Sequence, residues 1–193
     1  MTERFADSLY DTAFDRDSCG FGLIANLDDV PSHWVVQTAI SALARLTYRG
    51  AVAADGKTGD GCGLLLKFPT GFLRAVGEEL GFTLNKRFAA GTVFLSPDEA
   101  LAGVAKDAID QAIHDLGLEV AGWRDVPIDP TACGEQALRT LPGIQQVFVN
   151  APAGMARGRF NRRLFLARRR AEKHINDADT YIASLSSVTI SYK

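Results

Sequence analysis

The chain has 193 residues, and its 47% hydrophobic and 23% charged residues are the proportions of an ordinary globular domain. This composition excludes a collagen-like, disordered or disulfide-framework protein, and a single domain of this size buries about 70% of the surface that its unfolded chain exposes. Every apolar run is shorter than the roughly 18 residues that a membrane-spanning helix needs. The net charge of −2 is unevenly distributed, because eight of the 21 Lys and Arg residues lie between Arg157 and Lys173.

Three cysteines without a Cys-x-x-Cys pair indicate a reducing compartment, so we expect a cytoplasmic protein. Residues 1–18 are acidic and mixed in character, and they contain neither the apolar stretch nor the cleavage site of a secretory signal. They also show no strong helical or strand period. We therefore expect residues 1–18 to be a leader and residues 19–193 to form the domain.

In chain order, the first part of the sequence predicts two strands and two helices. A short apolar run predicts a strand at 19–25, and apolar residues at helical spacing predict a helix over 32–48. A loop rich in Gly and Asp follows at 49–63, and a buried strand at 64–68. A short helix over 70–80 comes next, and we expect the hydroxyl side chain at the start of each helix to cap it.

The middle of the sequence predicts three strands and one long helix. The first strand covers 90–95, and the helix begins in the capping box Ser96-Pro97-Asp98-Glu99 with Pro at the first helical position. The apolar periodicity then continues to Leu116, and Gly117 ends the helix. Two further strands are expected at 118–126 and 144–150.

The last part predicts a basic helix over 159–175 and a closing pair of strands at 180–185 and 188–192. Alternating strands and helices normally favour a parallel sheet, but the closing pair has the pattern of an antiparallel hairpin. No Gly-x-Gly-x-x-Gly or Gly-Lys-Ser/Thr sequence supports a nucleotide-binding parallel sheet. The pattern alone therefore leaves α/β and α+β open.

Cys19 is the first candidate for chemistry, because it stands between the leader and a Gly-x-Gly strand. If residues 1–18 are removed, Cys19 becomes the chain terminus, and its α-amine, with a pKa of about 8, can act as the base for its own thiol. Glycines on either side of Phe21 keep bulk away from the sulfur. The alternative is a buried structural thiol, which is the commoner state of a lone Cys.

The loop from Arg49 to Gly63 has two interpretations. Its glycines and aspartates can form an anion-binding nest of backbone N–H groups. We favour a tight turn into the next strand, in which Gly supplies positive φ angles. Arg49 directly follows an apolar helix and precedes a Gly, a position that can hold a guanidinium rigidly in a cleft. An ordinary surface salt bridge is the alternative for Arg49.

The basic helix can contact nucleic-acid phosphates through its charged side chains. The same helix carries an apolar stripe, which consists of Phe160, Leu164, Ala167, Ala171 and Ile175. It lacks an interleaved set of aromatic residues, and the chain as a whole is acidic. We therefore expect a solvated or acid-paired helix face, with no nucleic acid and no membrane among the partners.

No metal site is expected from the histidines. His33, His114 and His174 are scattered along the chain without ligand spacing, and nothing local supports a Cys–His protease pair. We interpret all three histidines as structural.

Six blocks of sequence, spread in order over nearly the whole chain, together carry a family resemblance. They are Leu9-Tyr10-Asp11, Asp17-Ser18-Cys19-Gly20-Phe21-Gly22-Leu23-Ile24-Ala25, Arg49-Gly50-Ala51 with Gly59-Asp60-Gly61, Gly122-Trp123-Arg124-Asp125-Val126-Pro127, Phe160 to Arg170, and Tyr181-Ile182-Ala183-Ser184-Leu185-Ser186-Ser187. In this combination the chain resembles the N-terminal glutaminase domain of the glutamate synthase large subunit.

The resemblance implies a class II glutamine amidotransferase, which is an N-terminal-nucleophile (Ntn) hydrolase. The implied fold is α+β, an αββα sandwich of antiparallel sheets between helices, present here in part. The implied reaction hydrolyses L-glutamine to glutamate and ammonia after the leader is removed. Cys19 is then the nucleophile that forms a γ-glutamyl thioester, its α-amine is the base, and Arg49 matches the family arginine that shapes the site.

The resemblance also implies a synthase domain in the full enzyme, which carries FMN and an iron–sulfur cluster and uses the ammonia to aminate 2-oxoglutarate. Neither cofactor is expected in this chain. Tyr48 departs from the family, which commonly has His there. The family's oxyanion-hole Asn-Gly, its second arginine and its acid for the glutamine amine match positions beyond Lys193, and this sequence has no Asn-Gly.

These departures predict an N-terminal fragment with very weak or no glutaminase activity alone, since losing one oxyanion donor costs about 100–1000-fold in rate. Two alternatives stay open. One is a catalytically silent remnant of the fold that acts as an interaction module. The other is the glutaminase part of another amidotransferase, although the blocks at Gly122–Pro127 and Phe160–Arg170 favour glutamate synthase.

Overall fold

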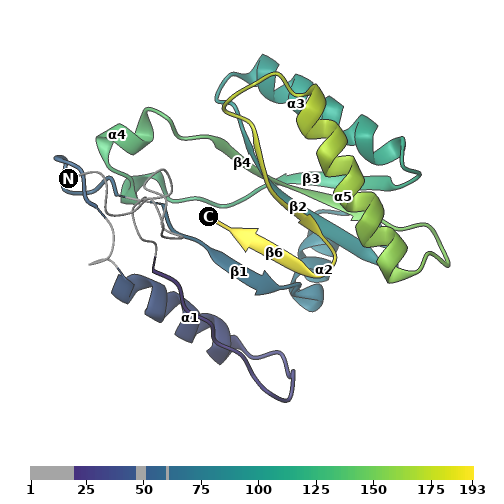
Figure 1. The fold of residues 1–193 in the computed structure, drawn as a ribbon, viewed down its shortest axis with the longest axis horizontal. Coiled ribbons are helices and arrows are strands. Elements are labelled where there is room, and N and C mark those ends of the chain that lie inside the picture. Colours follow the sequence, from purple (N-terminus) through teal and green to yellow (C-terminus); the bar gives the residue numbers. More distant parts are fainter. Residues whose placement is uncertain (1–19, 47–50, 60) are drawn as a thin grey trace, which may run out of the picture. The chain divides into compact units, whose positions relative to one another are not determined.

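The computed structural model describes residues 20–46, 51–59 and 61–193, and the chain divides into two units, Met1–Ala51 and Val52–Lys193 (Figure 1). Within the described residues, the first unit contains one helix, α1. The second unit contains six strands, four α-helices and a short 3₁₀ turn at Pro130–Ala132.

The first unit confirms the predicted helix and contradicts the predicted strand. Helix α1 spans His33–Arg45, and Ser32 is its N-cap residue by position, although the Ser32 side chain makes no capping hydrogen bond. Residues 20–25 form no strand, and Phe21 and Leu23 are 94% and 89% exposed. The apolar run there has the composition of a strand, but a strand also needs a hydrogen-bonded neighbour. No other described segment of this unit provides one.

A four-stranded antiparallel sheet organises the second unit. Its strands are β2 (Phe88–Leu95), β3 (Glu119–Asp125), β4 (Gly143–Asn150) and β5 (Tyr181–Ser186), in the spatial order β3-β4-β2-β5. All pairings in this sheet are antiparallel. The α+β class is therefore confirmed over the parallel α/β alternative, and β2 begins two residues earlier than predicted.

A second, two-stranded sheet pairs β1 (Leu64–Lys67) with β6 (Thr189–Tyr192). The predicted closing pair at 180–185 and 188–192 is therefore wrong as a pair, although both strands exist. Strand β5 is hydrogen-bonded to β2, and β6 is hydrogen-bonded to β1. The backbone of each strand is thus hydrogen-bonded to a partner far away in the sequence. The chain passes from one sheet to the other between β5 and β6.

Side-chain oxygens satisfy the backbone at this crossing. Ser186 Oγ accepts from the Val188 N–H over 3.0 Å, and Asn161 Oδ1 accepts from both the N–H and the hydroxyl of Ser187, over 3.2 and 2.8 Å. These bonds replace the ladder bonds that the chain loses when it leaves one sheet for the other.

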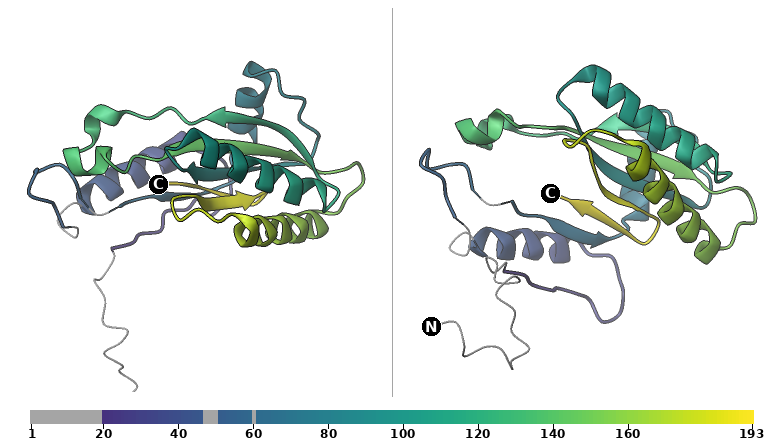
Figure 2. Two further views of the ribbon diagram at one scale, coloured as in Figure 1. Left: turned by 90° about the horizontal axis from the view of Figure 1, so that it is seen from above. Right: turned by 45° about the horizontal axis from the view of Figure 1, so that its top comes forward.

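Helices α3 (Glu99–His114) and α5 (Arg157–His174) pack side by side on one face of the four-stranded sheet (Figures 1 and 2). The apolar stripe predicted for the basic helix is confirmed, because its first four members are fully buried and Ile175 packs against them. Those four buried residues are Phe160, Leu164, Ala167 and Ala171. The Arg and Lys side chains of α5 occupy the other faces of the same helix.

The opposite face of the sheet packs against the two-stranded sheet and helix α2 (Thr70–Glu79). The core on this side contains Leu73, Phe88, Ala90, Phe148 and Ile190. The unit is therefore built of three layers, namely helices, a four-stranded sheet and a two-stranded sheet. This arrangement agrees with the predicted antiparallel sandwich, present in part.

Two predicted helix caps need correction. Helix α2 begins at Thr70 itself with Pro69 as its N-cap, so the Thr70 hydroxyl is not the cap. At α3 the capping residue is Asp98, whose carboxylate accepts from the backbone N–H groups of the first turn, while Ser96 Oγ accepts from the Asp98 N–H. Both oxygens lie within reach of the same helix start, and the ionised carboxylate is the stronger acceptor. Gly117, at φ 64°, follows this helix as predicted.

The packing of α5 predicts unequal effects of two adjacent truncations. Leu164 is fully buried, so Leu164→Ala should lower the free energy of unfolding by about 3 kcal/mol through lost burial and a cavity. Phe165 is 60% exposed, and Phe165→Ala should cost less than about 0.5 kcal/mol. Urea unfolding followed by circular dichroism measures both. Equal losses in the two variants would contradict the orientation of α5.

Candidate functional site

The residues predicted to carry chemistry, Cys19 and Arg49, lie outside the described residues, as do the leader 1–18 and Tyr48. The structure describes most of the glycine-rich loop that follows Arg49, the segments packed against that loop, and a basic pocket that the sequence did not predict.

The described part of the glycine-rich loop is a tight turn, as we favoured. Val52 and Gly59 form an isolated antiparallel bridge, and the Ala53 N–H donates to the Thr58 carbonyl over 2.7 Å. Gly56 lies at the tip with φ 69°, the left-handed conformation that Gly adopts without steric cost.

Asp55 occupies the backbone donors of this turn. Its Oδ1 accepts from the N–H groups of Lys57 and Thr58 over 3.0 and 2.7 Å, and its Oδ2 accepts from the Thr58 hydroxyl over 2.5 Å. The hydrogen bond from the Thr58 hydroxyl, together with these backbone bonds, holds the pKa of Asp55 well below its usual value. These N–H groups therefore bind a carboxylate of the chain itself, which contradicts the anion-nest alternative for this part of the loop.

The same turn is anchored to a helix nearly eighty residues later in the chain. Thr58 Oγ1 accepts from the Ala137 N–H over 3.3 Å, at the start of α4 (Glu135–Leu138). Gly134, the N-cap of α4, is buried so closely against Asp55 and Thr58 that a Cβ there would overlap both side chains. The sequence analysis did not predict α4, because a helix of four residues leaves no periodic signal.

The Gly122–Pro127 block makes packing contacts and buried polar contacts. A Cβ on Gly122 would overlap the Phe82 ring, and Trp123 Nε1 donates to Asp110 Oδ1 over 2.9 Å. Burial raises the pKa of Asp110 above its usual value, against the lowering effect of that hydrogen bond. Arg124 Nε donates over 2.8 Å to the side chain of Gln146, which is fully buried.

The serine block at 181–187 also supports the fold. Ser184 is buried, and its Oγ accepts from the Ser191 N–H over 3.2 Å and the Thr92 N–H over 3.4 Å. Ser184 thus ties β6 of one sheet to β2 of the other. The blocks that carry the family resemblance in this part of the chain therefore maintain the two-sheet architecture.

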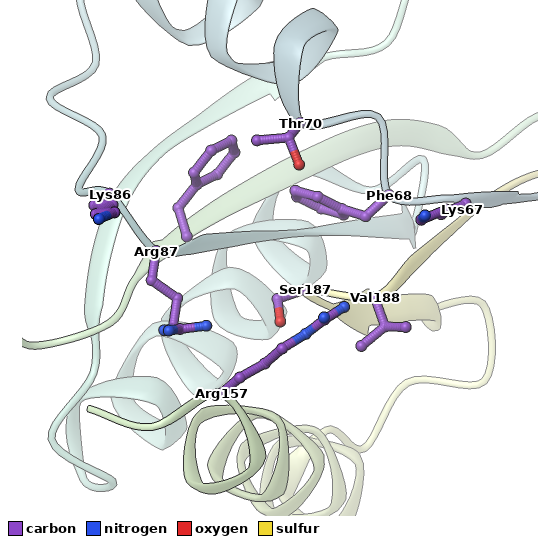
Figure 3. Close-up of a pocket in the computed structure, with 9 residues that line it drawn as sticks. Lys67, Phe68, Thr70, Lys86, Arg87, Arg157, Ser187 and Val188 are labelled. Carbon is purple, nitrogen blue, oxygen red and sulfur yellow. The ribbon is translucent and has the colours of Figure 1, made fainter. Parts of the chain in front are cut away.

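A basic pocket of about 400 Å³ lies at the carboxyl end of β1 (Figure 3). Its lining includes Lys67, Lys86, Arg87 and Arg157, which come from the end of β1, the segment before β2 and the start of α5. Arg157 belongs to the basic segment noted in the sequence. The sequence pattern did not indicate that the other three side chains form a site, because only the fold brings them together.

The described residues contain no group of three or more His, Cys, Asp or Glu side chains that is arranged to hold a metal ion. Cys62 is exposed and Cys133 half-buried, both as free thiols. Iron–sulfur clusters are generally held by four Cys thiolates, so these two thiols do not fit such a group. Among the described helices, none is long and apolar enough to cross a membrane.

Comparison with known proteins decides the family. Residues 19–193 match the family model of the class II glutamine amidotransferases. The chain belongs to this family. The predicted fold class and the predicted type of enzyme domain, a class II glutamine amidotransferase, are therefore confirmed.

The relatives of this class II amidotransferase domain are glutamate synthases. The chain is 35% identical over 192 residues to ferredoxin-dependent glutamate synthase 1, chloroplastic/mitochondrial, of Arabidopsis thaliana, covering 96% of this chain and 12% of that protein. It is 35% identical over 191 residues to the NADPH glutamate synthase large chain of Bacillus subtilis (strain 168), covering 97% and 13%. The corresponding protein of Azospirillum brasilense is 37% identical over 191 residues, with coverage of 96% and 13%. The chain thus spans only a small part of the length of these relatives.

The Asp55 turn makes a testable prediction about acid. A carboxylate with a lowered pKa in the folded state stabilises the turn above its usual pKa of 3.8, and this contribution is lost as the pH falls through the lower folded value. Asp55→Asn should reduce the protection of the Lys57 and Thr58 amides from hydrogen exchange at neutral pH, as measured by NMR. In the parent chain we expect the protection of these two amides to fall on strong acidification. In Asp55→Asn their protection should not change with this acidification.

Asp107→Asn is the matched control, because it removes one carboxylate from an exposed position on α3. The control should leave the protection of both amides unchanged. Unchanged protection in Asp55→Asn would show that the carboxylate does not hold the turn.

Proposed function

We propose that this chain supplies the glutaminase site of a glutamate synthase, with Cys19 as the nucleophile. The observation that carries the proposal is the family match, which begins at residue 19 and continues to residue 193. Its first residue is the cysteine that becomes the chain terminus if residues 1–18 are removed as a leader. The substrate of this site is L-glutamine.

The proposed reaction uses the thiol and the α-amine of Cys19 together. The amine takes the thiol proton, and Sγ attacks the side-chain amide carbon of glutamine. The resulting ammonium returns its proton to the amide nitrogen, so that the C–N bond breaks and ammonia leaves a γ-glutamyl thioester. Water, deprotonated by the amine, then attacks the thioester and releases glutamate and the free thiol. Arg49 shapes the site around the cysteine.

We propose that the ammonia is used in another part of a longer protein. The relatives are named as ferredoxin-dependent and NADPH glutamate synthases, and the chain covers 12% to 13% of each. We infer that a synthase domain outside these residues aminates 2-oxoglutarate with the ammonia, in the cytoplasm, and that FMN and an iron–sulfur cluster belong to that domain. Glutamine and this synthase domain are therefore the partners that we assign to the chain.

A covalent label tests the nucleophile directly. The probe is a glutamine analogue that carries an electrophilic diazoketone in place of the side-chain amide. If the α-amine lowers the thiol pKa by one unit, the thiolate fraction, and hence the rate of alkylation, rises about tenfold at neutral pH. We expect Cys19 to be alkylated at least about tenfold faster than Cys62, which is exposed and serves as an internal control. Peptide mass spectrometry measures both rates and also reports whether the chain begins at Cys19.

Cys19→Ala should abolish the fast labelling and leave the slow labelling of Cys62 and Cys133 unchanged. Labelling of Cys62 at the same rate as Cys19 would show that Cys19 is not activated. Fast labelling of Cys19 in chains that keep residues 1–18 would refute the role of its α-amine.

A further inference from the structure

The basic pocket at the carboxyl end of β1 is lined by several positively charged side chains and by no acidic side chain. Four of its nine lining residues are basic, namely Lys67, Lys86, Arg87 and Arg157, and none of the nine is acidic. All nine belong to the unit Val52–Lys193, so the pocket lies within a single unit. A cleft lined by side chains of one sign raises the local concentration of ions of the opposite sign.

Two arginines line this pocket. Figure 3 shows Arg87 and Arg157 entering it from separate segments, with Arg157 extending past Ser187 towards Val188. In the described part of the chain, neither guanidinium is held by an ion pair.

Other arginines of α5 do have acidic partners. Arg168 and Arg169 both contact Glu172, over 2.7 and 2.6 Å. The carboxylate of Glu172 thus pairs with arginines near the end of α5, whereas Arg157 lies at its start.

The backbone adds donors at the same place. Helices α2 and α5 both begin at residues that line the pocket, Thr70 and Arg157. Neither helix has an acidic residue in its first turn, and the N-cap residues, Pro69 and Ala156, have no side-chain oxygen that could accept from the first N–H groups. The first N–H groups of a helix carry partial positive charge, which strengthens the field that the basic side chains create.

A second cavity of about 490 Å³ adjoins the first and shares Lys86 and Arg87 with it. Its remaining wall is largely the segment Ala151–Ala156, which includes Pro152 and Met155 and has no charged residue. A pocket with several basic side chains thus lies beside a largely apolar one, and both volumes fall within the range of small-molecule sites.

We propose that the two cavities together bind a phosphate monoester of a small organic molecule. The phosphate group lies between Arg87 and Arg157, because the planar fork of a guanidinium binds phosphate oxygens in pairs. The organic part lies against Pro152 and Met155. This site is distinct from the glycine-rich loop, which precedes the opposite end of β1.

Calorimetric titration of the 193-residue chain at physiological salt tests the proposal, with phenyl phosphate, inorganic phosphate and citrate as probes. We expect one saturable site per chain. Phenyl phosphate should bind more tightly than inorganic phosphate, because its ring enters the second cavity, and citrate should bind more weakly than phenyl phosphate. The double variant Arg87→Gln/Arg157→Gln should weaken phenyl phosphate binding at least about tenfold.

Arg162→Gln/Arg170→Gln is the matched control, because it removes two positive charges from exposed positions of the same helix. Circular dichroism establishes that both double variants retain the parent fold. The control should bind phenyl phosphate as the parent chain does. The proposal is overturned if the parent shows no saturable binding, if the control loses as much affinity as the pocket variant, or if citrate binds as tightly as phenyl phosphate.

Discussion

Strand β2 is covered on both faces and both edges, and the architecture of the unit Val52–Lys193 depends on this burial. Its edges pair with β4 and β5, while Val93 points into the helix-side core and Ala90 into the core against the second sheet. Gly91 lies so close to β5 that a Cβ would stand 2.6 Å from the Ser184 carbonyl oxygen. Both backbone edges of β2 are therefore hydrogen-bonded, and the positions of β4 and β5 are fixed by their pairing with it.

The crossing between β5 and β6 follows from this arrangement. Strand β5 ends against β2, and after two intervening residues the chain begins β6 in the other sheet. Ser184, Ser186 and Asn161 accept the N–H groups that this change of sheet releases from a regular ladder. The crossing also brings Ser187 and Val188 to the carboxyl end of β1, where they form part of the basic pocket. The change of sheet around one central strand thus supplies part of the wall of this pocket.

Local features could be predicted from the sequence, and pairings distant in the chain could not. The stripe at Phe160 and Leu164 repeats with the helical period, and Gly117 ends α3 because only local backbone geometry is involved. The partner of β6 is β1, with Leu64 opposite Tyr192, and no local pattern contains that information. The prediction of a strand at 19–25 was wrong for the same reason, because the local pattern does not show whether a pairing partner exists. The turn around Gly56 was predictable, whereas its docking on α4 depends on residues nearly eighty positions away.

The two functional proposals depend on different residues, because the glutaminase proposal depends on Cys19 and the phosphate proposal on Arg87 and Arg157. In the described part of the chain, the resembling blocks supply packing and crossing contacts, as Gly122 and Ser184 illustrate. Their match therefore reports the architecture, whereas our proposal for the glutamine chemistry rests on Cys19. The pocket takes Arg87 and Arg157 from outside those blocks. The proposed anion site therefore rests on the positions and charges of these side chains and not on the family match.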